Sequence, residues 1–328
     1  MNNDEKAIVV TGGSGFIGSN VCELLVASGY NVFNIDRRKR DIPGVVQYPF
    51  EINTKQVKGV IDIIQPECVI HIAANNSVPN SVINPKDTYH DNVEQTISLL
   101  NVCVEAGVKN FMFASSSSVY GHSIHEDGSY KETDPMFPIN PYGRTKQICE
   151  QIIKDYCDVY DMNYSILRLF NVAGSNAGKN GYQKTPYVHV LPIIVEKALT
   201  NEVFDICGDD YDTPDGTCLR DYTHINDIAR GFLLALHQMF DNGINNTYNL
   251  GNSTPVSVLE LIKAVETELG EDINTNLVAP RSGDMVKTYA DVTFAKDNLG
   301  WEPTKTINDI IVDELAWQKP KLKRKHNL

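Results

Sequence analysis

Short apolar segments alternate with longer amphipathic segments over the first half of the chain. Apolar, β-branched runs predict strands at Ala7–Val10, Val32–Ile35, Val69–Ile72, Asn110–Ala114 and Ser165–Leu169. Apolar residues at helical spacing predict helices at Phe16–Ala27, around Val93–Glu105 and at Tyr142–Tyr160. Strands that alternate with helices are typical of βαβ units, in which helices cover both faces of a parallel sheet. The pattern therefore predicts an α/β fold with a doubly wound parallel sheet.

The regular alternation stops at about Gly174. Loops rich in Gly, Asn, Asp and Pro follow at 175–186 and 208–217, with shorter elements between them. We interpret residues 1–173 as the sheet domain. Residues 174–328 are predicted to be mainly a smaller lobe that covers the substrate, while some of its segments are free to return to the sheet.

The overall composition narrows the function classes. The chain has 328 residues, enough for a large core, and its net charge of -13 disfavours nucleic acid as a partner. The seven cysteines are dispersed, without a CxxC pair or zinc spacing, so we expect free thiols in a reducing cytoplasm and no metal. No signal peptide or membrane-spanning stretch is visible, so no membrane partner is expected.

A glycine-rich turn follows the first predicted strand. Its glycines fit a dinucleotide-binding motif. In such a motif, Gly18 allows the helix to pack closely on the strand, and the phosphates of the dinucleotide lie over the helix N-terminus. Asp36 ends the next strand, where a carboxylate can bind the ribose hydroxyls of NAD and repel the 2′-phosphate of NADP. The basic run 37–40 could instead hold a 2′-phosphate. Because Asp36 stands at the ribose position, we predict NAD.

Two further patterns suggest proton transfer chemistry. Tyr142 and Lys146 are four residues apart, which places both side chains on one face of a helix. A nearby ammonium lowers the pKa of a phenol, so the tyrosine could accept a proton from a sugar hydroxyl. The run Ser115–Ser118 lies at a strand end, where ligands bind in doubly wound sheets. The run by itself does not say which serine acts.

With these motifs the chain resembles the extended short-chain dehydrogenase/reductase family, and within it the UDP-glucose 4-epimerases over nearly the whole length. The most specific match is the segment 208–224, which closely follows the epimerase pattern GxDYxTxDGTxxRDYxHV. The resemblance implies a Rossmann-like domain with tightly bound NAD. It also implies inversion of C4 of a UDP-hexose through a 4-keto intermediate, and a homodimer packed through the helices at Val93–Glu105 and Tyr142–Tyr160.

The resemblance also assigns site residues. The catalytic residues it implies are Ser116, Tyr142 and Lys146. The cofactor-binding residues are Gly12, Gly15, Phe16, Ile17, Gly18, Asp36, Glu51, Ile52, Ala73, Asn92, Tyr142 and Lys146. The substrate-binding residues are Ser116, Asn171, His189, Val190, Arg220, Tyr222, Arg281, Asp284 and Thr288.

Several positions depart from the family pattern. Asn76 replaces a lysine of many members, Leu169 a tyrosine, and Glu51 an aspartate near the adenine. Thr288 stands where members restricted to unacetylated sugars carry a bulky aromatic residue, and the segment 77–82 resembles epimerases of N-acetylated sugars. We therefore predict that UDP-GlcNAc and UDP-GalNAc are accepted.

Three alternative functions compete with epimerisation. A nucleotide-sugar 4,6-dehydratase of the same family needs an Asp-Glu pair where this chain has Ser116 and Ser117, and a UDP-glucuronate decarboxylase needs a glutamate there. A non-enzymatic scaffold that senses NAD or UDP-sugars is the third. The intact Ser116, Tyr142 and Lys146 argue against it.

Overall fold

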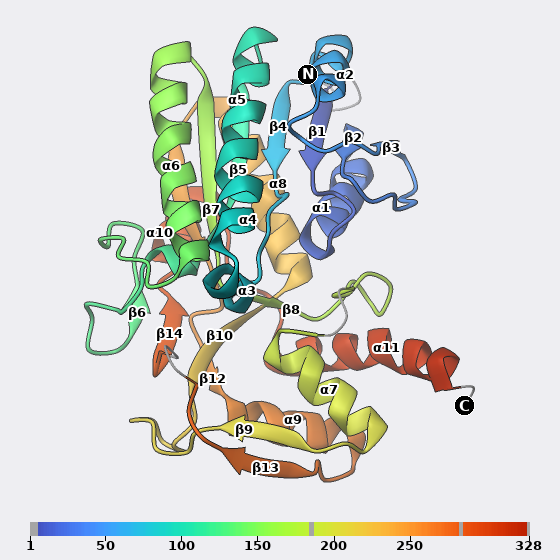
Figure 1. The fold of residues 1–328 in the computed structure, drawn as a ribbon, viewed down its shortest axis with the longest axis vertical. Helices are drawn as coiled ribbons and strands as arrows, with labels where there is room; N and C mark the ends of the chain where they lie inside the picture. The colour runs from blue at the N-terminus through green and yellow to red at the C-terminus, as the bar shows by residue number, and fades with distance from the viewer. Residues whose placement is uncertain (1–5, 184–186, 282–284, 327–328) are drawn as a thin grey trace.

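The computed structural model describes residues 6–183, 187–281 and 285–326, and the molecule has two lobes (Figure 1). The upper lobe contains a seven-stranded sheet in the order β11-β7-β5-β4-β1-β2-β3, in which every pairing is parallel. Its strands are β1 (Ala7–Thr11), β2 (Asn31–Ile35), β3 (Val45–Tyr48), β4 (Cys68–His71), β5 (Asn110–Ser116), β7 (Asn163–Leu169) and β11 (Asn246–Leu250). The predicted Rossmann-like architecture is confirmed.

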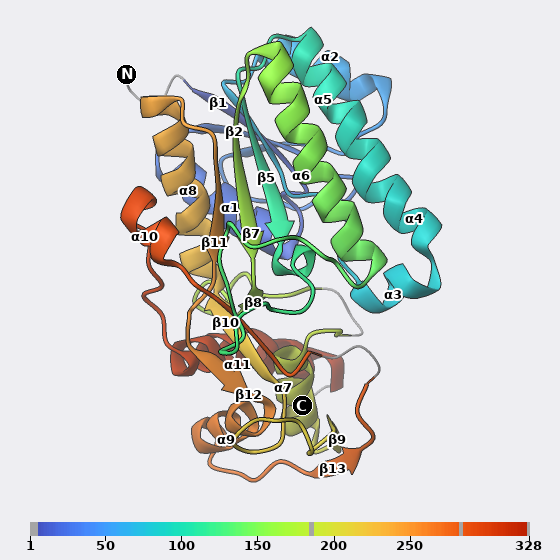
Figure 2. The ribbon, with the colours of Figure 1, turned by 90° about the vertical axis from the view of Figure 1, so that its left-hand side faces the viewer.

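Helices pack on both faces of this sheet and bury its two apolar surfaces. One face is covered by α1 (Phe16–Ala27), α8 (Ile225–Asn242) and α10 (Thr293–Leu299). The other is covered by α2 (Lys55–Ile64), α5 (Gln95–Glu105) and α6 (Pro141–Tyr160). In Figure 2, α5 and α6 lie side by side on the outside of the lobe.

The sequence interpretation left out several elements of this lobe, among them the helix α2 and the strand β3, and it began one helix too early. Strand β3 (Val45–Tyr48) was not predicted, because it pairs on one side only and its half-exposed residues carry no clear alternation. The helix expected around Val93–Glu105 begins regular α geometry at Gln95, after α3 (Val78–Ile83), α4 (Pro85–Tyr89) and a π-helical turn at His90–Glu94.

The smaller lobe is built from segments that leave the large sheet. A second sheet has the order β12-β10-β14-β6, with β8 paired to β10, and a separate pair joins β13 to β9. These strands are β6 (Ser129–Tyr130), β8 (Asn171–Ala173), β9 (Phe204–Cys207), β10 (Leu219–His224), β12 (Pro255–Ser257), β13 (Thr275–Val278) and β14 (Lys287–Ala290). The lobe's helices are α7 (Val190–Thr200), α9 (Val258–Leu269) and α11 (Ile307–His326). The chain returns to the first sheet between them, through α8 and β11.

Two further observations concern the chemistry of the chain. All seven cysteines are free thiols, and only Cys207 is not buried. Of the helices within the described ranges, none combines the length and apolarity needed to cross a membrane.

Candidate active site

The turn between β1 and α1 brings backbone unusually close to backbone. Gly12 has φ +75°, and its N–H donates to the carbonyl of Ile35 at 3.0 Å. A Cβ at Gly18 would lie 2.2 Å from the carbonyl oxygen of Gly12, so only glycine lets the helix approach the turn. Gly15 stands at the N-cap of α1, where the first N–H groups of the helix have no intrahelical acceptor. This geometry fits the phosphates of a dinucleotide.

Asp36 lies at the end of β2 beside this turn and is 9% exposed. Its carboxylate accepts hydrogen bonds from the backbone N–H groups of Ser14, at 3.1 Å, and Arg38, at 2.9 Å. The Arg38 guanidinium is mostly exposed and lies 3.9 Å from the same carboxylate. Asp36 is therefore a fixed anion at the edge of the cleft. It is placed to accept ribose hydroxyls and to repel a 2′-phosphate.

A cleft of about 400 Å³ runs from the glycine turn to the ends of β5 and β7. Most residues predicted to bind the cofactor line it, namely Gly12, Gly15, Phe16, Ile17, Gly18, Asp36, Glu51, Ile52, Ala73, Tyr142 and Lys146. Ser116, Asn171 and His189 from the predicted catalytic and substrate sets line it too. So do Asn76 and Leu169, two of the positions that depart from the family pattern. Arg38, from the basic run weighed as a 2′-phosphate site, lines it as well, whereas sequence reasoning missed Gln95, Phe170 and Tyr182 as wall residues.

Tyr142 is held at the first turn of α6. The side chain of Asn140 caps this helix by accepting from the N–H of Gly143, and the N–H of Tyr142 donates to Ser81 Oγ at 3.2 Å. A Cβ at Gly143 would lie 2.3 Å from the carbonyl oxygen of Ser118, so this glycine lets the helix touch the serine turn. Burial raises the pKa of the Tyr142 phenol to about 12, and a hydrogen bond with Ser116 opposes that rise.

Lys146 lies one turn further along α6 and is buried. Its Nζ donates to the carbonyl of Ala114 at 2.7 Å, and it lies 4.5 Å from the centre of the Phe113 ring and 6.0 Å from that of Tyr142. Burial lowers the pKa of this ammonium to about 8, while electrostatic interactions with Cys149 and Glu150 oppose the shift. The predicted shared face of Tyr142 and Lys146 therefore places a phenol and an ammonium at the same end of the cleft.

Asn92 lies behind the cleft wall and does not line it. It is buried in the π-helical turn, where its side-chain oxygen accepts from the N–H of Asn75 at 2.7 Å. Its amide nitrogen donates to the carbonyl of Asn75 and to Thr145 Oγ1. Thr145 in turn donates to the carbonyl of Tyr142. Asn92 thus ties the loop after β4 to the helix of Tyr142, which is a supporting position.

A segment of the small lobe closes over α1 near the glycine turn. The Tyr182 ring meets the Phe16 ring edge-on, with centroids 5.9 Å apart, and its carbonyl accepts from the indole N–H of Trp317. The side-chain oxygen of Asn180, which is fully buried, accepts from Ser19 Oγ and from Arg40. The sequence carried no local signal for these contacts, because their partners are far apart along the chain.

The remaining predicted substrate residues gather on the small lobe, outside the wall of the cleft. Arg220 on β10 is in register with Thr288 on β14, which is 7% exposed. Tyr222 is buried, which raises the pKa of its phenol, and the charges of Arg220 and Arg281 oppose that rise. The cations Arg220 and Arg281 therefore face one tyrosine. Val190 begins α7, one residue after His189. Asp284 lies outside the described residues.

Asp221 stands between Arg220 and Tyr222 and was not predicted from the sequence. It is fully buried and accepts backbone hydrogen bonds from Asn252, Ser253 and Ala290. Burial raises the pKa of this carboxyl and the bonds oppose the rise. Asp221 fixes β10 against two neighbouring segments. Within residues 6–183, 187–281 and 285–326, no three His, Cys, Asp or Glu side chains form a metal site.

Comparison with known proteins gives one consistent result. Residues 8–251 match the model of the NAD dependent epimerase/dehydratase family. The chain is 36% identical over 319 residues to a UDP-glucose 4-epimerase of Rhizobium meliloti (strain 1021), covering 94% of this chain and 95% of that one.

Solved structures show the same similarity. A UDP-glucose 4-epimerase from Stenotrophomonas maltophila, with bound NAD and formylated UDP-arabinopyranose, has a TM-score of 0.93 at 31% identity and covers 98% of this chain and 100% of its own. The UDP-Glc/GlcNAc 4-epimerase of Campylobacter jejuni has a TM-score of 0.83 at 28% identity, covering 96% of this chain and 99% of its own.

Proposed function

Because the chain belongs to the NAD dependent epimerase/dehydratase family, we propose that it is an NAD-dependent epimerase that inverts C4 of UDP-hexoses. The observation that carries the proposal is the arrangement along one cleft. The glycine turn and Asp36 lie at one end, and Ser116, Tyr142 and Lys146 lie at the other. The relative from Stenotrophomonas maltophila, which binds NAD and a UDP-sugar, supports it.

The residues of the cleft fit NAD. The close contact of Gly18 with Gly12 lets the N-terminus of α1 approach the turn, where its backbone N–H groups can hold the pyrophosphate, and the hydrogen-bonded Asp36 offers oxygens to a ribose. Lys146 and Tyr142 line the end of the cleft beyond them. The chemistry that NAD supplies when bound is reversible acceptance of a hydride from carbon. These residues would hold the dinucleotide in the cleft.

Tyr142 is the proposed base for the C4 hydroxyl. As the hydroxyl carbon becomes a ketone, the phenolate oxygen of ionised Tyr142 takes the hydroxyl proton, and Ser116 shares a hydrogen bond with that oxygen. Lys146 keeps a positive charge within reach of the phenol, which favours its ionised form. Because burial raises the pKa of Tyr142 to about 12 even against the Ser116 hydrogen bond, additional positive charge in the filled cleft is needed to bring this pKa toward neutrality.

Inversion requires the keto sugar to turn over while the nucleotide stays bound. A firm hold on the UDP pyrophosphate by Arg220 and Arg281 suits this demand, because guanidinium groups bind phosphate in a bidentate manner. The sugar itself then needs only loose contacts. On return, the proton goes back from Tyr142 to the O4 atom of the inverted sugar.

The geometry disfavours dehydration and decarboxylation. Those reactions need a carboxylate beside the catalytic tyrosine, and the wall segment Ser115–Ser118 at the end of β5 consists of serines. The carboxylates that do line the cleft, Asp36, Glu51 and Asp91, come from other segments of its wall. Epimerisation is the reaction that these residues can perform without a further acid.

We also propose that N-acetylated sugars are substrates. Thr288 is a small residue in register with Arg220, and it stands where relatives restricted to unacetylated sugars carry a bulky aromatic residue. The Campylobacter jejuni relative is named for action on both UDP-Glc and UDP-GlcNAc. A Thr288→Tyr variant is expected to lose turnover of UDP-GalNAc and to keep that of UDP-galactose.

The direct test is incubation of the purified protein with UDP-galactose, and separately with UDP-GalNAc, without added cofactor, followed by chromatography of the products. Formation of UDP-glucose supports the reaction, and formation of UDP-GlcNAc supports the wider range. Absence of both products from protein that contains NAD would instead favour a sensing scaffold.

A homodimer in the cytoplasm completes the proposal. Ile148 and Ile152 are half-exposed on α6, beside α5 on the outside of the large lobe, whereas Ile153 belongs to the core. Free thiols suit a reducing compartment. Light scattering of wild type and of Ile152→Glu tests the dimer, since an acid at a buried subunit contact is expected to separate the protomers.

A further inference from the structure

A buried ion pair lies directly beneath the catalytic residues. Glu150 on α6 is fully buried, and Arg168 on β7 is 2% exposed. Arg168 binds the carboxylate in a bidentate manner, with Nε at 3.0 Å from Oε1 and Nη2 at 2.7 Å from Oε2. The cost of removing two charges from water offsets most of their attraction, so a buried ion pair contributes little net stability. The pair is therefore expected to have a role other than stabilising the fold.

Each partner of the pair also holds one end of the turn that carries Ser116. Ser115 Oγ donates to Glu150 Oε1 at 2.5 Å, immediately before Ser116. Arg168 Nη1 donates to the hydroxyl of Tyr120 at 2.8 Å, immediately after the 3-10 turn Ser117–Val119. The turn is therefore fixed at both ends by one ion pair.

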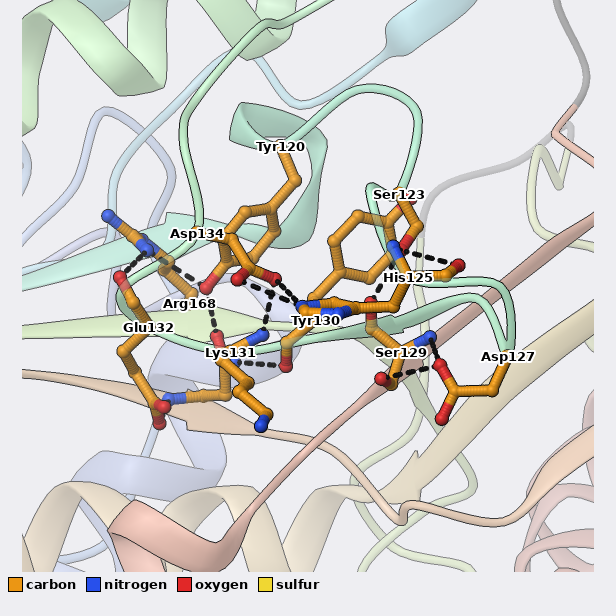
Figure 3. A network of polar contacts seen from close by, with 11 residues as sticks. Tyr120, Ser123, His125, Asp127, Ser129, Tyr130, Lys131, Glu132, Asp134 and Arg168 are labelled. Atoms are coloured by element: carbon orange, nitrogen blue, oxygen red, sulfur yellow. Dashed lines mark hydrogen bonds and ion pairs between the residues drawn. The ribbon is translucent and has the colours of Figure 1, made fainter.

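The arginine side of the pair extends into a wider polar network (Figure 3). Arg168 donates to the carbonyl of Glu132. The hydroxyl of Tyr120 donates onward to the side-chain oxygen of Asn249 at 2.6 Å. Asn249 donates in turn to the carbonyl of Tyr130. These bonds fix the guanidinium from the side opposite Glu150, so the hydroxyl of Tyr120 has one defined position.

The glutamate side of the pair reaches the other catalytic residues. Glu150 follows Lys146 by one helical turn, and its charge favours the ammonium form of that lysine. Lys146 also donates to Ala114, the residue before Ser115. Three titratable groups face Lys146, namely Glu150 and Cys149 from α6 and His71 from β4. Burial raises the pKa of the Cys149 thiol and lowers that of His71, so Glu150 is the charged one of the three.

We propose that Glu150 and Arg168 are positioning residues, which hold the turn of Ser116 from both ends. They do not touch the substrate, and they act through Ser115 and Tyr120. The proposal rests on the proposed epimerisation. It adds that the relative placement of Ser116, Tyr142 and Lys146 depends on this pair.

The principal test is the double variant Glu150→Leu/Arg168→Met in the full-length protein with its copurified NAD. Removing both charges leaves neither buried alone, so the variant is expected to stay folded. We expect kcat to fall about 10²-fold, because displacement of a catalytic group by about 1 Å has that effect. The KM for UDP-galactose and the NAD content should stay within about twofold of wild type. A folded double variant with wild-type kcat would overturn the proposal.

A milder variant keeps the test decisive if the double variant fails to fold. Ser115→Ala removes one of the two bonds to the turn and leaves the ion pair intact. It should lower kcat by roughly three- to tenfold, the equivalent of one hydrogen bond, with KM unchanged. Unchanged kcat in Ser115→Ala overturns the proposal as well.

A matched control removes a buried carboxylate elsewhere. Glu314 on α11 is also fully buried and accepts from Gln318 at 2.7 Å. Glu314→Gln should leave kcat and KM at wild-type values. Wild-type turnover tests the proposed function, and the ratio of variant to wild type tests the pair, so failure of one is distinguishable from failure of the other.

Discussion

Replacing Gly18 with alanine is expected to push α1 away from the glycine turn and to weaken cofactor binding. The added Cβ would lie 2.2 Å from the carbonyl oxygen of Gly12 and 2.7 Å from Cα of Gly13. Both neighbours are backbone atoms of a tight turn, so they cannot rotate away as a side chain would. The helix must move instead.

The size of the effect follows from these distances. Ordinary contact begins at 3.4 Å, so the helix N-terminus must shift by roughly 1 Å relative to the turn. Overpacking of this kind costs about 1–3 kcal/mol of unfolding free energy. A hydrogen bond from an N–H to a charged phosphate contributes about 1.5–3 kcal/mol, so loss of one such bond weakens NAD binding by about 10- to 100-fold.

The assay measures the NAD content of the purified protein and the Kd of the stripped protein by calorimetry. Gly59→Ala is the matched control, since a Cβ at this exposed position of α2 meets no atom within 4 Å. It should raise the unfolding free energy by roughly 0.5–1 kcal/mol and leave NAD binding unchanged. Full NAD content with wild-type affinity in Gly18→Ala would refute the assignment of this turn as the phosphate site.

Three further outcomes are expected. Tyr142→Phe should reduce kcat by about 10²- to 10⁴-fold, the usual contribution of a proton-transfer group, while calorimetry shows unchanged UDP binding; near-normal turnover would contradict the role. Because burial lowers the pKa of Lys146 to about 8, kcat should fall as pH rises through that value, and a profile that stays flat well above it would speak against the need for the ammonium. Burial also lowers the pKa of His71 from 6.5 to about 3. Between these two pH values the imidazole of His71 binds a proton in the unfolded chain and stays neutral in the folded chain. Stability is thus lost as pH falls below 6.5, by about 1.4 kcal/mol per pH unit for this one group, and denaturant titrations of His71→Gln should show a shallower dependence; an equal slope would exclude this contribution.

The parts of the fold that were predictable depend on short-range pattern. The strand Ala7–Val10, the glycine turn and the helix Phe16–Ala27 follow one another directly, so spacing alone predicts the β1–α1 unit. The same holds for Tyr142 and Lys146, which share a helix face. Strand β3 was not predicted, because an edge strand does not need apolar residues on both of its faces and so lacks a clear hydrophobic pattern.

The supporting contacts of the site were not predictable for a different reason. Arg168 and Glu150 are eighteen residues apart on different elements, and each resembles an ordinary surface charge in the sequence. Ser81 meets Tyr142 across sixty-one positions. The resemblance to a family named Asn92 as a cofactor-site residue but gave no position for its side chain. The structure places it behind the wall of the cleft. Tertiary packing alone brings such residues together.

The most direct measurement of the central claim is turnover of UDP-galactose that carries deuterium at C4, with the purified protein and no added cofactor. The account predicts UDP-glucose with the deuterium still at C4, since the hydrogen that leaves one face returns to the other within a single bound complex. Product that has lost the label to solvent would contradict the account.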